Sequence, residues 1–299
     1  EFEIGVESRS LVCAKVSKSK ISLVTMFFDI GRGDWSIENG HAPHLHRNND
    51  KYFEYFSNLA KLENDLTVFT SQEFESRIRQ LRQDRPTNIV VLDIDKKFKN
   101  LLGLIRSIQK NPKFIQNIPE HQLENPEYWS PKYVLITNLK TFFINHAIKK
   151  GLTSHTQIAW VDFGYCRDEN VLGNINYWSY AFDPKYLHFF TIKPPYYLGI
   201  VKNPHFPHTV AAAYEAIYQN KATIIGGVIV GTSDNWQMFY QYVVQTQKKL
   251  LANTIVDDDQ GIFVLTRMYC KKLIKLHFLG RGDWFGVFKN FSNHSGTDA

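Results

Sequence analysis

The sequence predicts an α/β protein with a central, mostly parallel sheet that is flanked by helices. Apolar runs rich in β-branched and aromatic residues alternate with segments of helical periodicity through the first 190 residues, which is typical of parallel strands with helical crossovers. The chain has 299 residues, of which 43% are hydrophobic and 21% charged, so it can bury a substantial core. The apolar run at 157–161 ends at Asp162, and Gly164 follows. A strand that ends in this way presents a carboxylate at the ligand-binding edge of an open sheet.

The individual elements follow from local patterns. Apolar runs bounded by Gly, Pro or charged residues predict strands at 21–28, 66–70, 88–95, 157–161, 186–192, 222–232 and 272–278. Helical spacing of apolar residues predicts helices at 51–62, 73–82, 98–109, 133–149, 210–219 and 234–251, and from about 260 to 270. Residues 1–19 and 291–299 lack such a period. We therefore expect two tails around one domain at 20–290.

The charge of the chain favours an anionic partner. A net charge of +6 and a pI near 9.0 suit a nucleotide-sugar, a phospholipid surface or a nucleic acid. No helix-turn-helix, zinc-finger or RNP pattern is present, so we expect no nucleic-acid partner. Three widely spaced cysteines fit a reducing compartment, and no run approaches the roughly 18 apolar residues of a membrane span. We expect a cytoplasmic location, including the inner face of the membrane, or a Golgi-type lumen if an anchor preceded Glu1.

Two short patterns suggest ion binding. The pentapeptide GRGDW occurs at 31–35 and at 280–284, each time after an apolar strand, and predicts two tight loops that each present an Arg to an anion. Asp93 and Asp95 would lie on one side of a strand, which suits a divalent cation, although the KKFK that follows would equally neutralise them on a surface. The histidines at 41–46 lack a fourth ligand, so a solvated loop is expected there.

Other candidate residues have two interpretations each. Asp162 either carries function or forms an Asx turn before Gly164. Gly226 and Gly227, inside an apolar strand, mark either close approach by a ligand or another backbone, or a bulge. The acidic run at 257–259 is either part of a site or a solvated helix start. Lys140 either contacts a phosphate or is a surface charge on a helix.

Four segments, WVDFGY, IIGGVIVG, DDDQGIF and LHFLGRGDW, stand in an order and spacing that resemble the GT-A nucleotide-sugar glycosyltransferases, especially the retaining enzymes of family 8. The opening VTMFFDIGRGDW, together with AWVDFGY, resembles the HtrL/YibB (WlaTB-like) group, which is found in lipopolysaccharide and surface-glycan gene clusters. This second resemblance is the more specific and runs from about residue 20 to 285. It implies a GT-A fold with a nucleotide-sugar-binding half at about 20–165 and an acceptor half at about 166–290.

The resemblance also implies roles for individual residues. Donor binding would fall to Phe28, Asp29, Arg32, Lys140, Asp162, Gly164, Gly280 and Arg281. Gly226, Gly227 and Trp284 would bind the acceptor, and Asp259, Gln260 and Asp258 would be catalytic. Asp162 and His277 would hold Mn²⁺ or Mg²⁺, which would offset the charge of the departing diphosphate.

The chain departs from the family 8 pattern at two places. Gly164 replaces the second Asp of the Asp-x-Asp, and Gly282 or Asp283 replaces the Lys of the last motif. Asp95, Asp168 or the acidic run at 257–259 could supply the missing metal ligand.

We expect a glycosyltransferase that moves a hexose from a nucleotide-diphosphate sugar, UDP-linked by preference, to a glycan or glycolipid acceptor such as lipopolysaccharide, with peripheral membrane association. The Asp259–Gln260 match favours retention of configuration; inversion would make one carboxylate of 257–259 the general base. The alternative is a catalytically inactive glycan- or nucleotide-binding module of the same fold.

Overall fold

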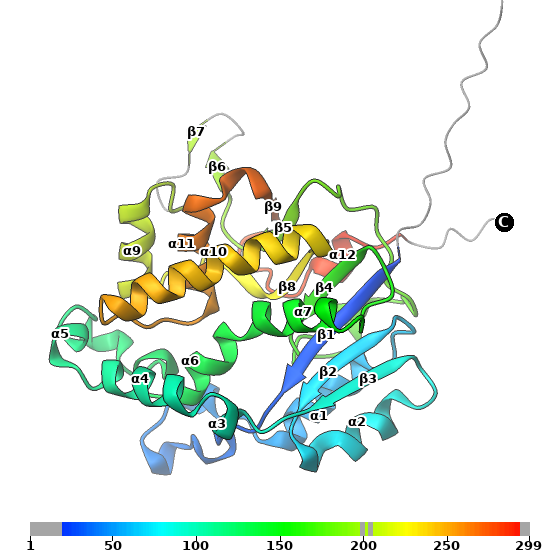
Figure 1. The fold of residues 1–299 in the computed structure, drawn as a ribbon, viewed down its shortest axis with the longest axis horizontal. Helices are drawn as coiled ribbons and strands as arrows, with labels where there is room; N and C mark the ends of the chain where they lie inside the picture. The colour runs from blue at the N-terminus through cyan, green and yellow to red at the C-terminus, as the bar shows by residue number, and fades with distance from the viewer. Residues whose placement is uncertain (1–19, 198–200, 203–205, 294–299) are drawn as a thin grey trace, which may run out of the picture.

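The computed structural model describes residues 20–197, 201–202 and 206–293, and its centre is a seven-stranded sheet (Figure 1). The strands are ordered β3-β2-β1-β4-β8-β5-β9. Their bounds are β1 Ile21–Phe27, β2 Leu66–Thr70, β3 Thr87–Val91, β4 Gln157–Val161, β5 Leu187–Thr191, β8 Ile224–Thr232 and β9 Ile274–Phe278, and β6 (Tyr196–Tyr197) pairs with β7 (Val201–Lys202) separately. Within the seven-stranded sheet of the described residues, β8 alone is antiparallel to its neighbours, β4 and β5. The predicted α/β class with a mostly parallel sheet is confirmed.

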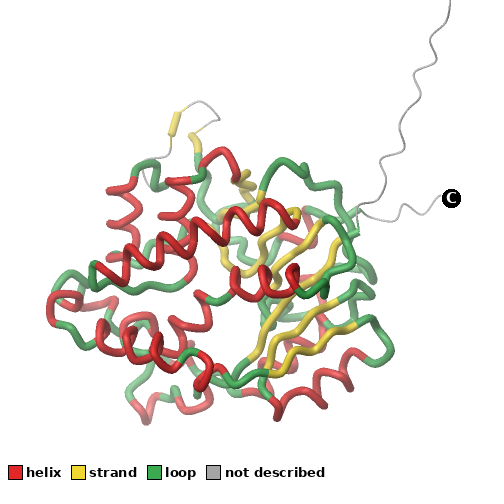
Figure 2. Tube along the Cα trace, viewed as in Figure 1, coloured by secondary structure: helices red, strands yellow, loops and turns green. Residues whose placement is uncertain are grey.

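Helices cover both faces of the sheet (Figure 2). The first face packs against α3 (Ile94–Lys97), α4 (Lys99–Gln109), α5 (Pro112–Ile115), α6 (Pro131–Asn138), α7 (Lys140–Lys149), α9 (Val210–Tyr218), α10 (Ser233–Ala252) and α11 (Asp259–Tyr269). The second face packs against α1 (Asn49–Leu59), α2 (Glu75–Arg82), α8 (Glu169–Leu172) and α12 (Val287–Asn290). Alternate residues of β1 enter the two cores, Val24 the first and Leu23 the second, as the period of a strand requires.

The strand order reverses between β1 and β4. From β1 the chain continues to β2 and β3 on one side, whereas β4 pairs with β1 on the other, parallel and with Val24 opposite Trp160. The carboxyl ends of β1 and β4 therefore meet at one edge of the sheet. Open α/β sheets bind ligands outside the carboxyl ends of the strands at such a reversal. The amino end of β8 reaches the same edge, because Val228 pairs with Val161.

Two elements differ from their predicted form. The strand expected at 88–95 ends at Val91, and the Asp93 side chain accepts a hydrogen bond from the Lys96 amide as the N-cap of α3. Asp95 pairs with Lys132, so the two carboxylates do not form a chelating pair. The helix expected at 133–149 is two helices, α6 and α7. It breaks where the carbonyl of Asn138 accepts a hydrogen bond from the Gln247 side chain.

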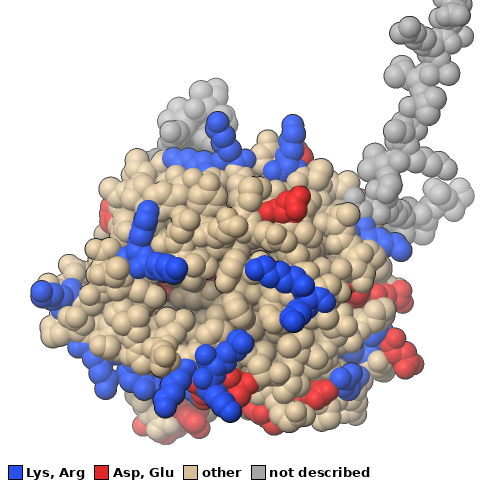
Figure 3. Space-filling model, in the orientation of Figure 1, with Lys and Arg blue, Asp and Glu red and all other residues tan. Residues whose placement is uncertain are grey.

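One face of the molecule carries its positive charge in a dispersed form. Lys and Arg side chains are spread over the face shown in Figure 3 rather than gathered into one patch. Among the described residues, none of the helices combines the length and apolar character needed to span a bilayer. The predicted tail at 1–19 lies outside the described residues. The tail predicted at 291–299 begins too early, because Phe291 packs against His277 and its carbonyl accepts a hydrogen bond from the Trp178 indole; residues 294–299 lie outside the described residues.

Arg82, at the end of α2, is fully buried and joins the segments around β2. Its guanidinium donates hydrogen bonds to the carbonyls of Ala60, Leu62, Asn64 and Pro86 and to the Thr87 hydroxyl. We expect Arg82→Lys to lower the free energy of unfolding by about 3 kcal/mol, because a single ammonium cannot satisfy these acceptors.

Urea denaturation measures this loss. Arg79→Lys, one turn earlier and exposed, is the control and should change stability by less than about 0.5 kcal/mol. Equal effects of the two substitutions would contradict the role given to Arg82.

Candidate active site

A cavity of about 690 Å³ opens where the carboxyl ends of β1 and β4 meet the amino end of β8. The loop after β1, the start of α1, α6, the first residues of α7 and α11, the segment after β4 and the pair Trp284 and Phe285 also line it. Its charged side chains are four cations, Arg32, Arg47, Lys140 and Arg167, and three carboxylates, Asp29, Asp162 and Asp259. The cavity thus combines anion-binding groups with carboxylates at the edge where this sheet topology places a ligand.

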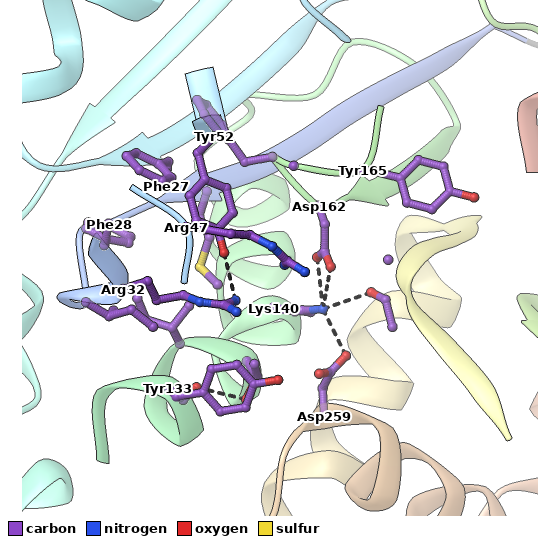
Figure 4. Close-up of a pocket in the computed structure, with 18 of the residues that line it drawn as sticks. Phe27, Phe28, Arg32, Arg47, Tyr52, Tyr133, Lys140, Asp162, Tyr165 and Asp259 are labelled. Atoms are coloured by element: carbon purple, nitrogen blue, oxygen red, sulfur yellow. Dashed lines mark hydrogen bonds and ion pairs between the residues drawn. The ribbon is translucent and has the colours of Figure 1, made fainter. Parts of the chain in front are cut away.

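Lys140, the first residue of α7, is at the centre of the site (Figure 4). Its ammonium lies 2.9 Å from Asp162 Oδ1, 2.9 Å from Asp259 Oδ2 and 2.9 Å from the carbonyl oxygen of Gly226. These partners come from the end of β4, the start of α11 and β8. The Lys140 side chain is only 5% exposed, so the interpretation as a surface charge is wrong.

The charges around Lys140 keep it protonated. Burial alone would lower its pKa, but the charges of Asp162 and Asp259 outweigh burial, and the pKa is raised. A buried ammonium bound by two carboxylates is well satisfied, whereas removing one partner of a buried ion pair typically costs about 3–5 kcal/mol. The three side chains therefore form one electrostatic unit.

The two carboxylates of this unit differ in their exposure to solvent. The Asp162 side chain is 40% exposed and that of Asp259 is 5% exposed. The Trp160 indole donates a 2.7 Å hydrogen bond to Asp162 Oδ1, and the Asp162 amide donates to the Gly227 carbonyl at 2.8 Å. Asp162 is thus held on both sides while it faces the cavity. Its carboxylate is bound by the side chains of Trp160 and Lys140, contacts that an Asx turn does not include.

Gly226 and Gly227 admit the protein's own side chains. A Cβ on Gly226 would overlap the carboxylate of Asp259 and lie 3.1 Å from the Lys140 ammonium. A Cβ on Gly227 would lie 2.8 Å from the ring of Tyr165. These glycines leave room for side chains of other elements, and the register between β8 and β5 also shifts across them, between Ile224 and Ile229. Both glycines line the cavity, where the resemblance places the acceptor.

We expect Gly226→Ala to displace Asp259 from Lys140 and to lower the free energy of unfolding by about 1–3 kcal/mol, as overpacking does. Thermal and urea denaturation measure the change. Gly103→Ala, within α4 and with open space around the added methyl group, is the matched control and should stabilise the chain by about 0.5–1 kcal/mol. A Gly226→Ala variant as stable as the wild type would argue against the tight packing described.

Arginines form the opposite wall. Arg32 donates to the Tyr52 hydroxyl at 2.9 Å and to the Leu45 carbonyl at 2.9 and 3.1 Å, which fixes its guanidinium. Arg167 lies over the ring of Tyr55 at 4.6 Å. Figure 4 shows Arg32 and Arg47 pointing toward the space next to Lys140. This wall can bind an anion such as a phosphate, because guanidinium groups match phosphate oxygens in charge and geometry.

An acidic cluster lies behind the site. Burial first, and then the neighbouring carboxylates, raises the pKa of Asp257 and Asp258 well above their usual range. Asp258 also caps α11 by accepting a hydrogen bond from the Gln260 amide at 2.9 Å. Burial raises the pKa of Glu127 to about 7, and the charge of Asp259 acts in the same direction. Of the acidic run at 257–259, only Asp259 reaches the cavity.

The Glu127 carboxyl should make stability depend on pH. Its pKa is about 7 in the folded chain against 4.5 for the free group, so the folded state binds more protons between these values. The Glu127 contribution to the free energy of unfolding should therefore fall as the pH rises from about 4.5 to about 7. Urea denaturation of the wild type and of Glu127→Gln at about pH 5 and about pH 8 isolates this contribution as their difference.

Glu124→Gln, at an exposed position, serves as the control and should follow the wild type. A difference between wild type and Glu127→Gln that does not vary with pH would contradict the assignment.

The structure brings most of the residues expected in the site together. Phe28, Asp29, Arg32, Lys140, Asp162, Gly164, Gly226, Gly227, Asp259, Gln260 and Trp284 all line the cavity. Asp258, His277, Gly280 and Arg281 are not part of its wall. The two GRGDW loops thus differ, because Arg32 lines the cavity and Arg281 does not.

His277 lies away from Asp162. It is on β9, three strands from β4, or roughly 14 Å at the usual spacing of strands. Its ring packs against Phe190 and Phe291 on the second face of the sheet, and its Nε2 lies 2.8 Å from Nδ1 of His188. Asp162 instead contacts Trp160 and Lys140, which belong to the first face. The two residues expected to share a metal ion are therefore not brought together.

The donor set at Asp162 does not fit a divalent ion. The described residues contain no group of three or more His, Cys, Asp or Glu side chains that could hold a metal. Asp162 and Asp259 are already paired with Lys140. Asp168 caps α8, and Asp95 pairs with Lys132, so neither supplies the missing ligand. Mn²⁺ or Mg²⁺ stays a prediction from the resemblance.

Sequence reasoning missed three residues of the arginine wall, Arg47, Tyr52 and Arg167. Arg47 comes directly after the histidines at 41–46, in the polar segment for which the sequence favours a solvated loop over a metal site. Its position in the chain could have indicated a role in the site, because this loop leaves the carboxyl end of β1 and leads directly into α1. Arg167 comes five residues after Asp162, in a segment that carried no recognisable pattern.

Comparison with known proteins places the chain in a family. The model of the HtrL_YibB family, described as bacterial protein of unknown function, matches residues 19–293. The chain belongs to this family. Within the HtrL_YibB family, Protein HtrL of Escherichia coli (strain K12) is 42% identical over 278 residues, which are 93% of this chain and 94% of that protein. The resemblance to HtrL/YibB is confirmed.

Among solved structures, the apo form of mouse xyloside xylosyltransferase 1 is similar over 92% of this chain and 95% of that chain. The TM-score is 0.44 and the sequence identity 11%.

Proposed function

We propose that the protein is a glycosyltransferase of the GT-A type, which moves a hexose from a nucleotide-diphosphate sugar to a glycan or glycolipid acceptor. The observation that carries the proposal is the composition of the cavity at the β1–β4 reversal. There, guanidinium groups face a pair of carboxylates joined by Lys140. Guanidinium groups suit a diphosphate, and a carboxylate suits a sugar hydroxyl.

The transfer reaction requires a different function from each side of the cavity. In the transfer, the acceptor hydroxyl oxygen forms a bond to the anomeric carbon while the bond from that carbon to the diphosphate oxygen breaks. The electron pair leaves with the diphosphate, so negative charge grows beside Arg32 and Lys140, where fixed cations stabilise it. The acceptor hydroxyl also loses a proton. Asp162, the more exposed carboxylate, is our candidate to accept it.

The acceptor side is formed by Gly226, Gly227 and Trp284, which line the cavity next to Asp162. A glycolipid acceptor would bring the protein to a membrane surface, in keeping with its net charge of +6. Displacement by an acceptor that Asp162 deprotonates would invert the configuration, whereas the Asp259–Gln260 pattern favours retention; the anomeric proton of the product distinguishes the two outcomes in an NMR spectrum.

The proposal is tested with a panel of UDP-, GDP- and CMP-linked sugars and glycan acceptors, with release of the nucleotide as the readout. We expect turnover with at least one donor. Asp162→Asn should lower kcat by about 10²- to 10⁴-fold, the range for loss of a general base. Asp234→Asn, an exposed carboxylate at the start of α10, is the matched control and should leave kcat unchanged. No release from any donor, with or without Mn²⁺, would contradict the proposal.

The second candidate is a binding module that kept the fold without the chemistry. Gly164, in place of a second carboxylate, favours it. Binding and turnover separate the two candidates. A pure binder would hold its ligand equally well in the wild type and in Asp162→Asn and would show no turnover in either.

A further inference from the structure

We propose that this chain binds the diphosphate of its donor without a divalent cation. The ammonium of Lys140 takes the position of the cation between Asp162 and Asp259, and Arg32 and Arg47 bind the phosphate oxygens. The inference rests on the proposed function for the nature of the ligand. It replaces the Mn²⁺ or Mg²⁺ that the resemblance implies.

The first step of the argument is the coordination of Lys140. Its nitrogen lies within 3.2 Å of both Asp162 oxygens and is 2.9 Å from Asp259 Oδ2 and 2.9 Å from the Gly226 carbonyl oxygen. These are carboxylate and carbonyl oxygens, the ligand type of a hard divalent cation. The oxygens that could begin a metal shell are therefore already bound to a cation of the protein.

The second step is the charge at this position. A divalent ion at Asp162 would lie beside a buried ammonium, and like charges this close repel strongly where water is scarce. Lys140 cannot simply move away. Its side chain is buried, its ammonium lies 5.9 Å from the centre of the Trp160 ring, and its removal would leave Asp259 as an unpaired buried carboxylate. The site as built disfavours a second cation.

The third step concerns the cationic side chains of the cavity that can bind a diphosphate. The guanidinium of Arg47 makes no hydrogen bond or ion pair within the described part of the chain, and it points into the cavity (Figure 4). Arg32 is held by Tyr52 and Leu45. Four cations line the cavity against three carboxylates, and one of these, Asp29, accepts hydrogen bonds from Gly31 and Asn49. The surplus of positive charge can accept a diphosphate.

The first experiment is calorimetric titration of the full chain with UDP and with inorganic pyrophosphate, in EDTA and in Mn²⁺. We expect binding in EDTA, with a Kd within about threefold of that in Mn²⁺. Binding that is about tenfold or more tighter in Mn²⁺ would overturn the proposal. No binding in either buffer would also overturn it.

The second experiment uses variants. Arg47→Ala should weaken pyrophosphate binding in EDTA by about tenfold, as loss of one charge-assisted contact does. Arg106→Ala, which removes the same charge from an exposed position on α4, is the control and should not change the Kd. Equal effects of the two variants would contradict an arginine site in the cavity.

The third experiment tests the position of the ammonium. In Lys140→Ala, the oxygens of Asp162, Asp259 and Gly226 would face an open space, so we expect this variant to bind Mn²⁺, seen as loss of the free-ion signal in electron paramagnetic resonance. The wild type should leave that signal unchanged. Binding of Mn²⁺ by the wild type would overturn the proposal. If Lys140→Ala does not fold, the titrations in EDTA and in Mn²⁺ and the Arg47→Ala variant still test the proposal.

Failure of this inference can be told apart from failure of the proposed function. Turnover that requires Mn²⁺ would support the sugar transferase and overturn the ammonium role. Metal-free binding of UDP or pyrophosphate without turnover of any nucleotide-sugar would support the diphosphate site and contradict the enzyme.

Discussion

The contact on which the rest of the site depends is the buried ammonium of Lys140 between two carboxylates. It joins the end of β4, through Asp162, to the start of α11, through Asp259, and to β8 through the Gly226 carbonyl. Three segments distant in the sequence are thus held by one side chain. A buried charge with this many partners permits little displacement, because each lost contact leaves an unpaired buried group. Rigidity of this kind lets a cavity stabilise charge as it develops.

Sequence reasoning succeeded where local pattern and topology agree. The apolar run before Asp162 fixed β4, and the rule that ligands bind at the carboxyl ends of parallel strands then located the cavity. Sequence reasoning failed where tertiary contacts determine the environment of a residue. Lys140 lies in a helix with no clear apolar stripe, so its burial depends on carboxylates 22 and 119 positions away in the sequence. Likewise, a motif match gave His277 its role, but its place on β9 turns its ring to the second face of the sheet.

The glycines of β8 show how the same pattern can carry a different meaning. Two adjacent glycines in an apolar strand left close approach or a bulge open, and the register between β8 and β5 does shift across them, between the pairs Ile224–Thr191 and Ile229–Phe189. What approaches Gly226 is Asp259, and what approaches Gly227 is the ring of Tyr165. These side chains belong to other elements that reach the same edge, so no local pattern identifies them. A glycine in a strand therefore indicates that another group lies close to the backbone. Only the fold shows which group that is.

Gly164 extends this argument to the Asp-x-Asp position. A Cβ there would lie 3.1 Å from two ring carbons of Tyr52, closer than packed atoms normally lie, and a carboxylate would reach further. The Tyr52 hydroxyl accepts a hydrogen bond from Arg32 and so helps to fix that guanidinium at the cavity. The absent carboxylate is therefore more than a lost ligand. Gly164 makes room for the tyrosine that supports an arginine, and the site gains a fixed positive charge where a metal-binding pattern would have supplied a negative one.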